Sequence, residues 1–123
     1  MTSIEEFIEA RLGEDERIAR AAFLAGTPTT AQWSADAPEV RSADSTLVVK
    51  HTWPKEAEHI ARHDPARALQ MCRALRCMIA SLRLAHYIDD DTLDETLFHD
   101  DLRPLARVWR AHEDFDPEWE WAA

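Results

Sequence analysis

The chain has 123 residues, 46% of them apolar and 31% charged, so it can form a globular core without the help of a metal or a disulfide. It contains two glycines, and its formal net charge of −10 arises from 24 acidic and 14 basic residues. The scarcity of glycine favours helices, and the negative charge argues against direct binding of nucleic-acid phosphates. We therefore expect one mainly α domain over residues 1–123, with an α+β fold as the alternative.

The N-terminal segment predicts a helix that begins near Ile4. Ser3 and Glu6 have the spacing of a capping box, and apolar residues then recur at helical spacing. Gly26 and Pro28 are typical helix stops. Acidic residues stand where a signal peptide needs basic ones, and no apolar run is long enough to cross a bilayer. We expect a cytoplasmic protein without a membrane partner.

The next segment predicts a loop followed by a strand. Residues 27–45 are rich in Thr, Ala, Ser, Asp and Pro, whereas residues 46–53, T-L-V-V-K-H-T-W, contain the β-branched residues that favour extended structure. A strand needs a partner, which we expect at Gln32–Ser34 or at Glu39–Arg41. The prediction is a short two-stranded β ribbon laid on the helices.

Two helices are expected to meet at Asp64. A short helix over residues 54–63 must end there, because Pro65 disfavours helical geometry in the residue before it. Asp64 is also a strong N-cap candidate for a longer helix that runs to His86, with Pro65 in its first position. The broad apolar stripe of this longer helix predicts the centre of the core. The core residues predicted on it are Leu69, Leu75, Ile79 and Leu82.

The C-terminal part predicts one more helix and a tail. Asp100 or Asp101 is expected to cap the helix, which tolerates Pro104 in its first turn. The tail carries Trp119 and Trp121 between glutamates. These tryptophans either cover the core as a lid or form an exposed acidic and aromatic tail that docks on a partner, since Trp is enriched at binding hot spots.

The candidate chemistry lies near the expected corner between the two middle helices. His59 and His63 have the four-residue spacing that can hold zinc, but no third ligand and no H-E-x-x-H motif accompany them. Arg67 could bind an anion at the start of the long helix, or pair with Glu58 or another acid of the preceding helix and so fix the corner. We favour structural roles: a histidine pair bonded to carbonyls and an ion pair between Arg67 and an acid of the preceding helix. No catalytic, cofactor-binding or metal-binding residue is assigned, and no cofactor.

Three sequence blocks resemble a known family. They read I-E-E-F-I-E-A-R-L-G-E-D-E-R-I-A-R-A-A at 4–22, E-H-I-A-R-H-D-P-A-R-A-L at 58–69 and L-R-P-L-A-R-V-W-R-A-H-E-D-F-D-P-E-W at 102–119, with Trp33 after the first block. In these blocks the chain is similar to a family of small acidic actinobacterial and actinophage proteins, the domain of unknown function 6221. The resemblance implies that source and a cytoplasmic location. It implies no activity and transfers no catalytic residue.

These observations favour a non-enzymatic protein-binding module that acts through an acidic, tryptophan-bearing surface on a protein partner, for which a basic protein is suited. The alternatives are a small-anion-binding or metal-binding enzyme centred on the corner, a homodimer formed through the apolar face of the long helix, and an acidic mimic of nucleic acid. The candidate partner- or anion-binding residues are His59, His63, Arg67, Trp119 and Trp121.

Overall fold

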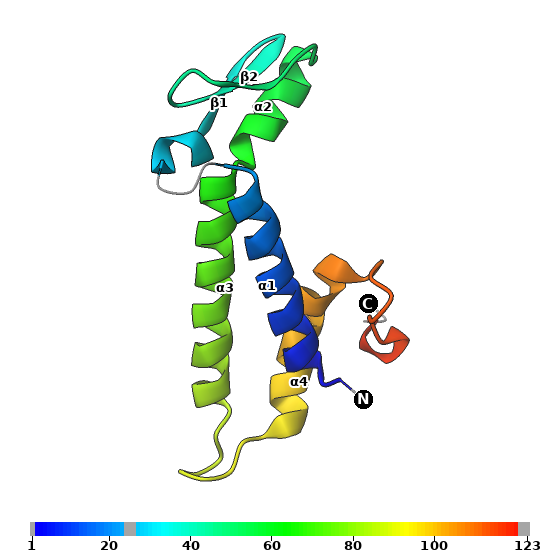
Figure 1. Cartoon of the computed structure of the whole chain (residues 1–123). Helices are drawn as coiled ribbons and strands as arrows, with labels where there is room; N and C mark the ends of the chain where they lie inside the picture. Colours follow the sequence, from blue (N-terminus) through cyan, green and yellow to red (C-terminus); the bar gives the residue numbers. More distant parts are fainter. Residues whose placement is uncertain (1, 24–26, 121–123) are drawn as a thin grey trace. The chain divides into compact units, whose positions relative to one another are not determined.

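The computed structural model describes residues 2–23 and 27–120, which divide into two compact units (Figure 1). Unit 1 comprises Met1–Gly13 and Ala74–Ala123, and unit 2 comprises Glu14–Arg73. The fold is mainly α with a small β-sheet, as the sequence predicts. Within the described part of the chain, no helix combines the length and the apolar character that crossing a membrane requires.

Two long helices each contribute to both units. Helix α1 spans Ile4–Ala21 and helix α3 spans Pro65–Ala85. The predicted N-caps are confirmed: the Ser3 hydroxyl accepts a hydrogen bond from the Glu6 amide at 3.1 Å, and an Asp64 carboxylate oxygen accepts one from the Arg67 amide at 2.8 Å. Because both helices run through both units, we still predict that the chain unfolds as one domain.

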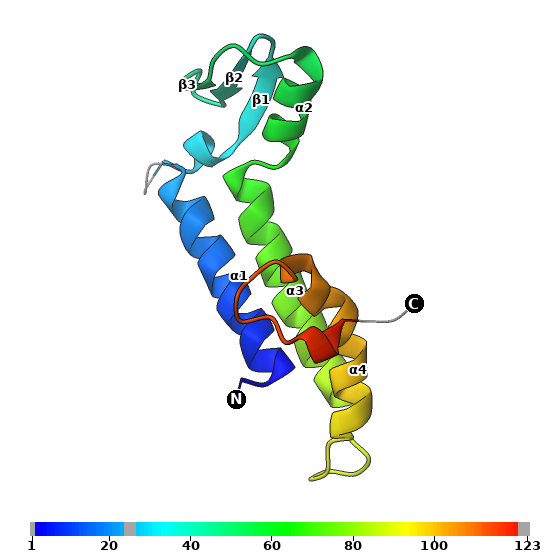
Figure 2. The ribbon, with the colours of Figure 1, turned by 90° about the vertical axis from the view of Figure 1, so that its right-hand side faces the viewer.

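Unit 2 contains a three-stranded antiparallel sheet packed on helix α2 (Figure 2). The strands lie in the order β1-β2-β3, and Val40 on the central strand pairs with both neighbours and is fully buried. Its buried neighbours on α2 are Ala57 and Ala61. The elements are β1 (Trp33–Asp36), β2 (Glu39–Ser42), β3 (Leu47–Val49) and α2 (Pro54–Arg62).

The predicted two-stranded ribbon is wrong in its number of strands. Both segments that we named as alternative partners contribute to strands: Gln32–Ser34 overlaps β1 from Trp33 onward, and Glu39–Arg41 lies within β2. The reason is that β2 bonds along both of its edges, to β1 on one side and to β3 on the other. A central strand of this kind leaves fewer exposed backbone groups than a two-stranded ribbon would.

Unit 1 is organised around aromatic and aliphatic side chains of α1 and α4. Helix α4 spans Glu95–Ala106, and its Asp94 N-cap accepts a hydrogen bond from the Leu97 amide at 3.1 Å. The predicted caps Asp100 and Asp101 are therefore wrong, and Pro104 lies inside the helix rather than in its first turn. The most deeply buried large side chains of this unit are Phe7, Ile8, Leu12, Phe98 and Leu102.

The prediction that α3 forms the centre of the core is only partly confirmed. Ile79 is buried, but Leu69, Leu75 and Leu82 are each only half-buried. In unit 1, α3 turns one side towards α1 and α4, where Arg76 and Arg83 pair with glutamates of α1. The rest of its wide apolar stripe stays accessible, and for this reason periodicity alone overstates its burial.

Candidate functional site

Asp64 fixes the corner between α2 and α3 in unit 2. One of its carboxylate oxygens accepts the hydrogen bond from the Arg67 amide, and the other accepts one from the Trp33 amide at 3.1 Å. One side chain thus ties the first strand to the start of the long helix. Because both oxygens are engaged, Asp64 serves as a structural cap and is a poor candidate for a metal ligand.

The two predicted histidines lie at the end of α2. His63 Nδ1 is 2.8 Å from the His59 carbonyl oxygen, and the two imidazole rings lie 4.4 Å apart between centroids. A carbonyl can only accept, so His63 Nδ1 carries the hydrogen and its Nε2 keeps a lone pair unless the ring is charged. The expected histidine–carbonyl bond is confirmed for His63. Within the described residues, no group of three His, Cys, Asp or Glu is placed to hold a metal ion.

The structure brings the three predicted corner residues to one cavity, which we call the corner pocket. It is an open cavity of about 710 Å³, formed by α2, the start of α3 and the first strand. The sequence analysis missed two of its cations, Lys55 and Arg62, which lie before and after His59 at helical spacing. The lining residues are Trp33, Ala35, Lys55, Glu58, His59, Ala61, Arg62, His63, Asp64 and Arg67.

Three permanent cations line the corner pocket: Lys55, Arg62 and Arg67. In the part of the chain that the structure describes, none of them has an ion-pair partner. The predicted ion pair of Arg67 with Glu58 or another acid of α2 is therefore not formed. The corner is instead fixed by Asp64, which accepts hydrogen bonds from two backbone amides. Glu58 is the one lining acid whose oxygens accept no hydrogen bond from a described residue. The pocket has a surplus of hydrogen-bond donors and positive charge.

A spacing signal could have revealed the two missed cations. Lys55, His59 and Arg62 are separated by four and then three residues, so they lie on one face of α2. Arg67 follows on α3, directly beyond the Asp64 cap. Reading these positions as one basic face would have extended the predicted corner from three residues to five.

The tail residues do not join this site. Trp119 is 5% exposed in unit 1, where its ring lies 5.1 Å from that of Phe7 and 5.6 Å from that of Phe115. The alternative of an exposed docking tail is therefore corrected for Trp119, which covers the core as a lid. Trp121 lies outside the described residues. The most exposed tryptophan among those described is Trp53, at 75%, which immediately precedes α2.

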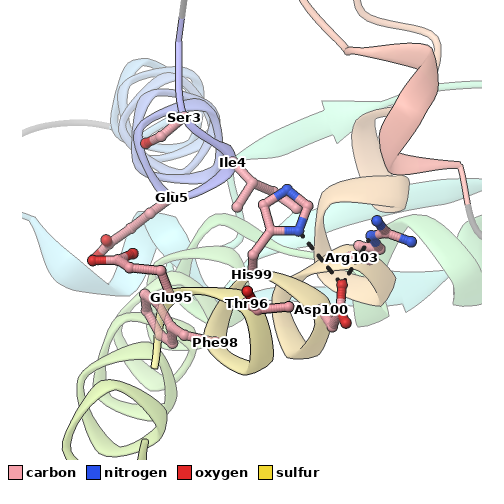
Figure 3. Close-up of a pocket in the computed structure, with 9 residues that line it drawn as sticks. All are labelled: Ser3, Ile4, Glu5, Glu95, Thr96, Phe98, His99, Asp100 and Arg103. Atoms are coloured by element: carbon pink, nitrogen blue, oxygen red, sulfur yellow. Dashed lines mark ion pairs between the residues drawn. The ribbon is translucent and has the colours of Figure 1, made fainter. Parts of the chain in front are cut away.

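A second cavity, of about 370 Å³, lies in unit 1 at the starts of α1 and α4 (Figure 3). Its lining contains three carboxylates, those of Glu5, Glu95 and Asp100, and one permanent cation, Arg103. Asp100 lies 3.7 Å from His99 and 3.5 Å from Arg103, as the dashed lines in Figure 3 show, and Glu5 pairs with Arg83 of α3. Because carboxylates outnumber cations in its lining, this cavity is a weaker candidate for binding an anion than the corner pocket.

Comparison with known proteins supports the family resemblance seen in the sequence. No curated protein and no solved structure matches the chain. One family model does match, over residues 1–121, and it is described as a family of unknown function, DUF6221. Since the match covers nearly the whole chain, the protein belongs to the DUF6221 family of unknown function.

Proposed function

We propose that the chain is a non-enzymatic, cytoplasmic protein-binding module of actinobacterial or phage origin, and that it holds an acidic group of its partner in the corner pocket. The observation that carries this proposal is the set of three cations, Lys55, Arg62 and Arg67, which line one cavity without ion-pair partners in the described chain. Lys and Arg side chains on a protein surface usually pair with an acid or lie in solvent apart from other cations. Three of them around one cavity therefore favour an anionic ligand in it.

The geometry of the donors suits a carboxylate. Two of the three cations are arginines, whose planar guanidinium groups can bond both oxygens of a carboxylate at once. Trp33 offers an apolar wall beside them, since it also lines the pocket and is half-buried. An acidic side chain of a peptide would thus find charge, paired donors and an apolar contact in one place.

Binding is better supported than catalysis at this corner. No hydroxyl or thiol nucleophile is among the residues that line the pocket, and both oxygens of Asp64 are engaged as caps. The partner group proposed here is acidic, whereas the net charge of −10 on the chain had favoured a basic partner. The difference arises because cations predominate among the charged residues that line the corner pocket. The Trp119 side chain is not part of the proposed contact surface, because it is buried.

The test is a titration with a rhodamine-labelled ten-residue peptide of alternating Glu and Gly, followed by fluorescence anisotropy. Replacing Arg62→Gln or Arg67→Gln should each weaken binding about tenfold, the typical loss of one charge-assisted hydrogen bond. Arg73→Gln is the matched control, because Arg73 is an exposed arginine of the same unit that does not line the pocket. Raising the salt concentration should weaken binding further.

A Gln/Gly peptide of the same length checks that charge drives the interaction. The proposal is wrong if the Glu/Gly peptide binds no better than the Gln/Gly peptide. It is also wrong if Arg73→Gln weakens binding as much as Arg67→Gln does, because the interaction would then be a diffuse attraction to basic residues.

A further inference from the structure

His63 is the C-cap of α2, and the helix fixes its ring. Its backbone amide nitrogen lies 3.2 Å from the His59 carbonyl oxygen, and its Nδ1 lies 2.8 Å from the same oxygen. Because a carbonyl oxygen can only accept, Nδ1 already carries a hydrogen, and a proton taken up by this ring must go to Nε2. The His63 ring therefore has one defined site for an added proton.

Of the two histidines in the corner pocket, His63 is the better place for that proton. It stands at the C-terminal end of α2, where the partial negative charge of a helix stabilises a cation. Its Nδ1 already donates to a carbonyl, and a charged ring donates more strongly than a neutral one. The His59 and His63 rings lie 4.4 Å apart between centroids, so charges on both would repel. The pair therefore takes up one proton, on His63.

The charged side chains that surround His63 in the pocket come from α2 and from the start of α3. The described residues of β1 in the lining carry no charge. Cations outnumber carboxylates in this lining, so they oppose a further positive charge while the pocket is empty. An anion in the pocket would attract the imidazolium and accept a hydrogen bond from its Nε2. The charged lining residues are Lys55, Glu58 and Arg62 of α2, the cap Asp64, and Arg67 of α3.

We propose that His63 is a fourth cationic donor of the corner pocket, and that the pocket binds an acidic group together with one proton taken up at His63 Nε2. This inference rests on the proposed function and adds its regulation, because binding then tightens as the pH falls from 8 to 6. Over this range carboxylates stay charged and Lys and Arg stay protonated. Imidazole is therefore the group among the described lining side chains that titrates there.

The expected size of the effect follows from linkage. The factor by which the anion favours the proton equals the factor by which the proton favours the anion. One charge-assisted hydrogen bond corresponds to a factor of about ten. For a model imidazole, which titrates near pH 6.5, this factor makes the dissociation constant about five times larger at pH 8 than at pH 6.

The experiment measures binding of the rhodamine-labelled Glu/Gly peptide to the full chain at pH 6 and pH 8, at constant ionic strength, by fluorescence anisotropy. Wild type should bind about five times more weakly at pH 8. His63→Gln should differ less than about twofold between the two pH values, because the glutamine amide can still donate to the His59 carbonyl but does not titrate. Circular dichroism at both pH values checks that the variant is folded.

Two matched variants show which histidine carries the proton. His59→Gln keeps the carbonyl that holds His63 and should retain at least about a threefold difference between the two pH values. His51→Asn replaces an exposed histidine of the same unit that does not line the pocket, and it should behave as wild type. Asparagine suits this position because its φ is 58°.

A measurement on wild type alone counts the proton. Isothermal titration calorimetry with the Glu/Gly peptide at pH 7, in MOPS and in imidazole buffer, should give binding heats that differ with the ionisation enthalpy of the buffer. The difference should correspond to uptake of about half a proton per bound peptide, as expected for a model imidazole coupled by a factor of ten.

The outcomes separate this inference from the proposed function. If wild type binds the peptide equally at pH 6 and pH 8, or takes up no proton, the inference is wrong and the anion-binding proposal stands. The inference is also wrong if His63→Gln keeps the pH dependence, or if His59→Gln or His51→Asn abolishes it, since another ring would then carry the proton. If the peptide binds at neither pH, both the proposed function and this inference fail.

Discussion

The two units differ most in charge and in what their charges do. Unit 1 has fifteen acidic and six basic residues, whereas unit 2 has nine and eight and is nearly neutral. In unit 1 several arginines are paired with acids of neighbouring elements, and in unit 2 three cations around the corner pocket have no ion-pair partner among the described residues. The net charge of a chain therefore does not predict the sign of its local sites.

The units also differ in how they are held together. In unit 1 the Phe7 ring lies within 5.9 Å of both the Phe115 and the Trp119 rings, so a C-terminal segment is anchored by aromatic packing. In unit 2 the sheet, α2 and α3 meet through the two hydrogen bonds of Asp64 and a small cluster of aliphatic side chains. Packing dominates in the first unit and polar capping has a larger share in the second.

The largest effect is expected from breaking the aromatic packing of unit 1. Phe7→Ala should lower the free energy of unfolding by about 3–5 kcal/mol, because it leaves a cavity beneath Phe115 and Trp119. Urea denaturation followed by tryptophan fluorescence measures the change. Val108→Ala is the control and should cost less than about 0.5 kcal/mol, since Val108 is exposed. Similar losses in the two variants would show that the ring cluster contributes no special stability.

A smaller effect is expected from the corner of unit 2. Asp64→Ala should cost about 2 kcal/mol, because it removes the N-cap of α3 and the hydrogen bond to the Trp33 amide. Asp36→Ala removes another acid of unit 2, exposed and without a side-chain bond to a described residue, and should cost less than about 0.5 kcal/mol. Denaturant titration gives both values, and hydrogen exchange of the Trp33 amide should accelerate in Asp64→Ala alone. Unchanged exchange there would contradict the role given to this carboxylate.

The smallest effect concerns pH and the turn between β2 and β3. A side-chain hydrogen bond from Ser42, together with bonds from Thr46, holds the pKa of Asp44 below its usual value. The charged Asp44 carboxylate therefore stabilises the folded state fully at pH values above the ordinary pKa of Asp, which is about 4. This stabilisation is lost as the pH falls through the lowered pKa of the folded state. Wild type and Asp44→Asn should differ in urea midpoint at pH 6, and this difference should shrink as the pH falls through the lowered pKa of Asp44. A difference independent of pH would rule out this linkage.

Local signals correctly predicted the starts of α1 and α3. Ser3 and Asp64 cap the helices they were assigned to, because capping depends on residues within one turn. The cap of α4 was misplaced because several aspartates precede it, and only the tertiary position of the chain selects Asp94. The third strand was missed for a related reason: the sequence names candidate partners for a strand but does not fix how many of them pair.

The site was predicted in part. His59, His63 and Arg67 do line one pocket, since they are close in sequence and lie on consecutive helices. The lid was one of the two alternatives for Trp119 and is confirmed for that residue. Its contact with Phe7 was not predictable, because Phe7 lies 112 residues earlier in the chain. The half-exposure of Leu75 and Leu82 likewise depends on which neighbours cover α3, and periodicity does not contain that information.

The central claim is that the basic corner of the nearly neutral unit, and not the acidic unit, binds acidic partners. It is tested most directly by recording amide NMR shifts of the labelled full chain during titration with the Glu/Gly peptide. The account predicts that the largest shifts occur at Lys55, Arg62, His63 and Arg67, and that Arg67→Gln needs about tenfold more peptide to reach half of their full size. Largest shifts in unit 1, or equal shifts in wild type and Arg67→Gln, would contradict it.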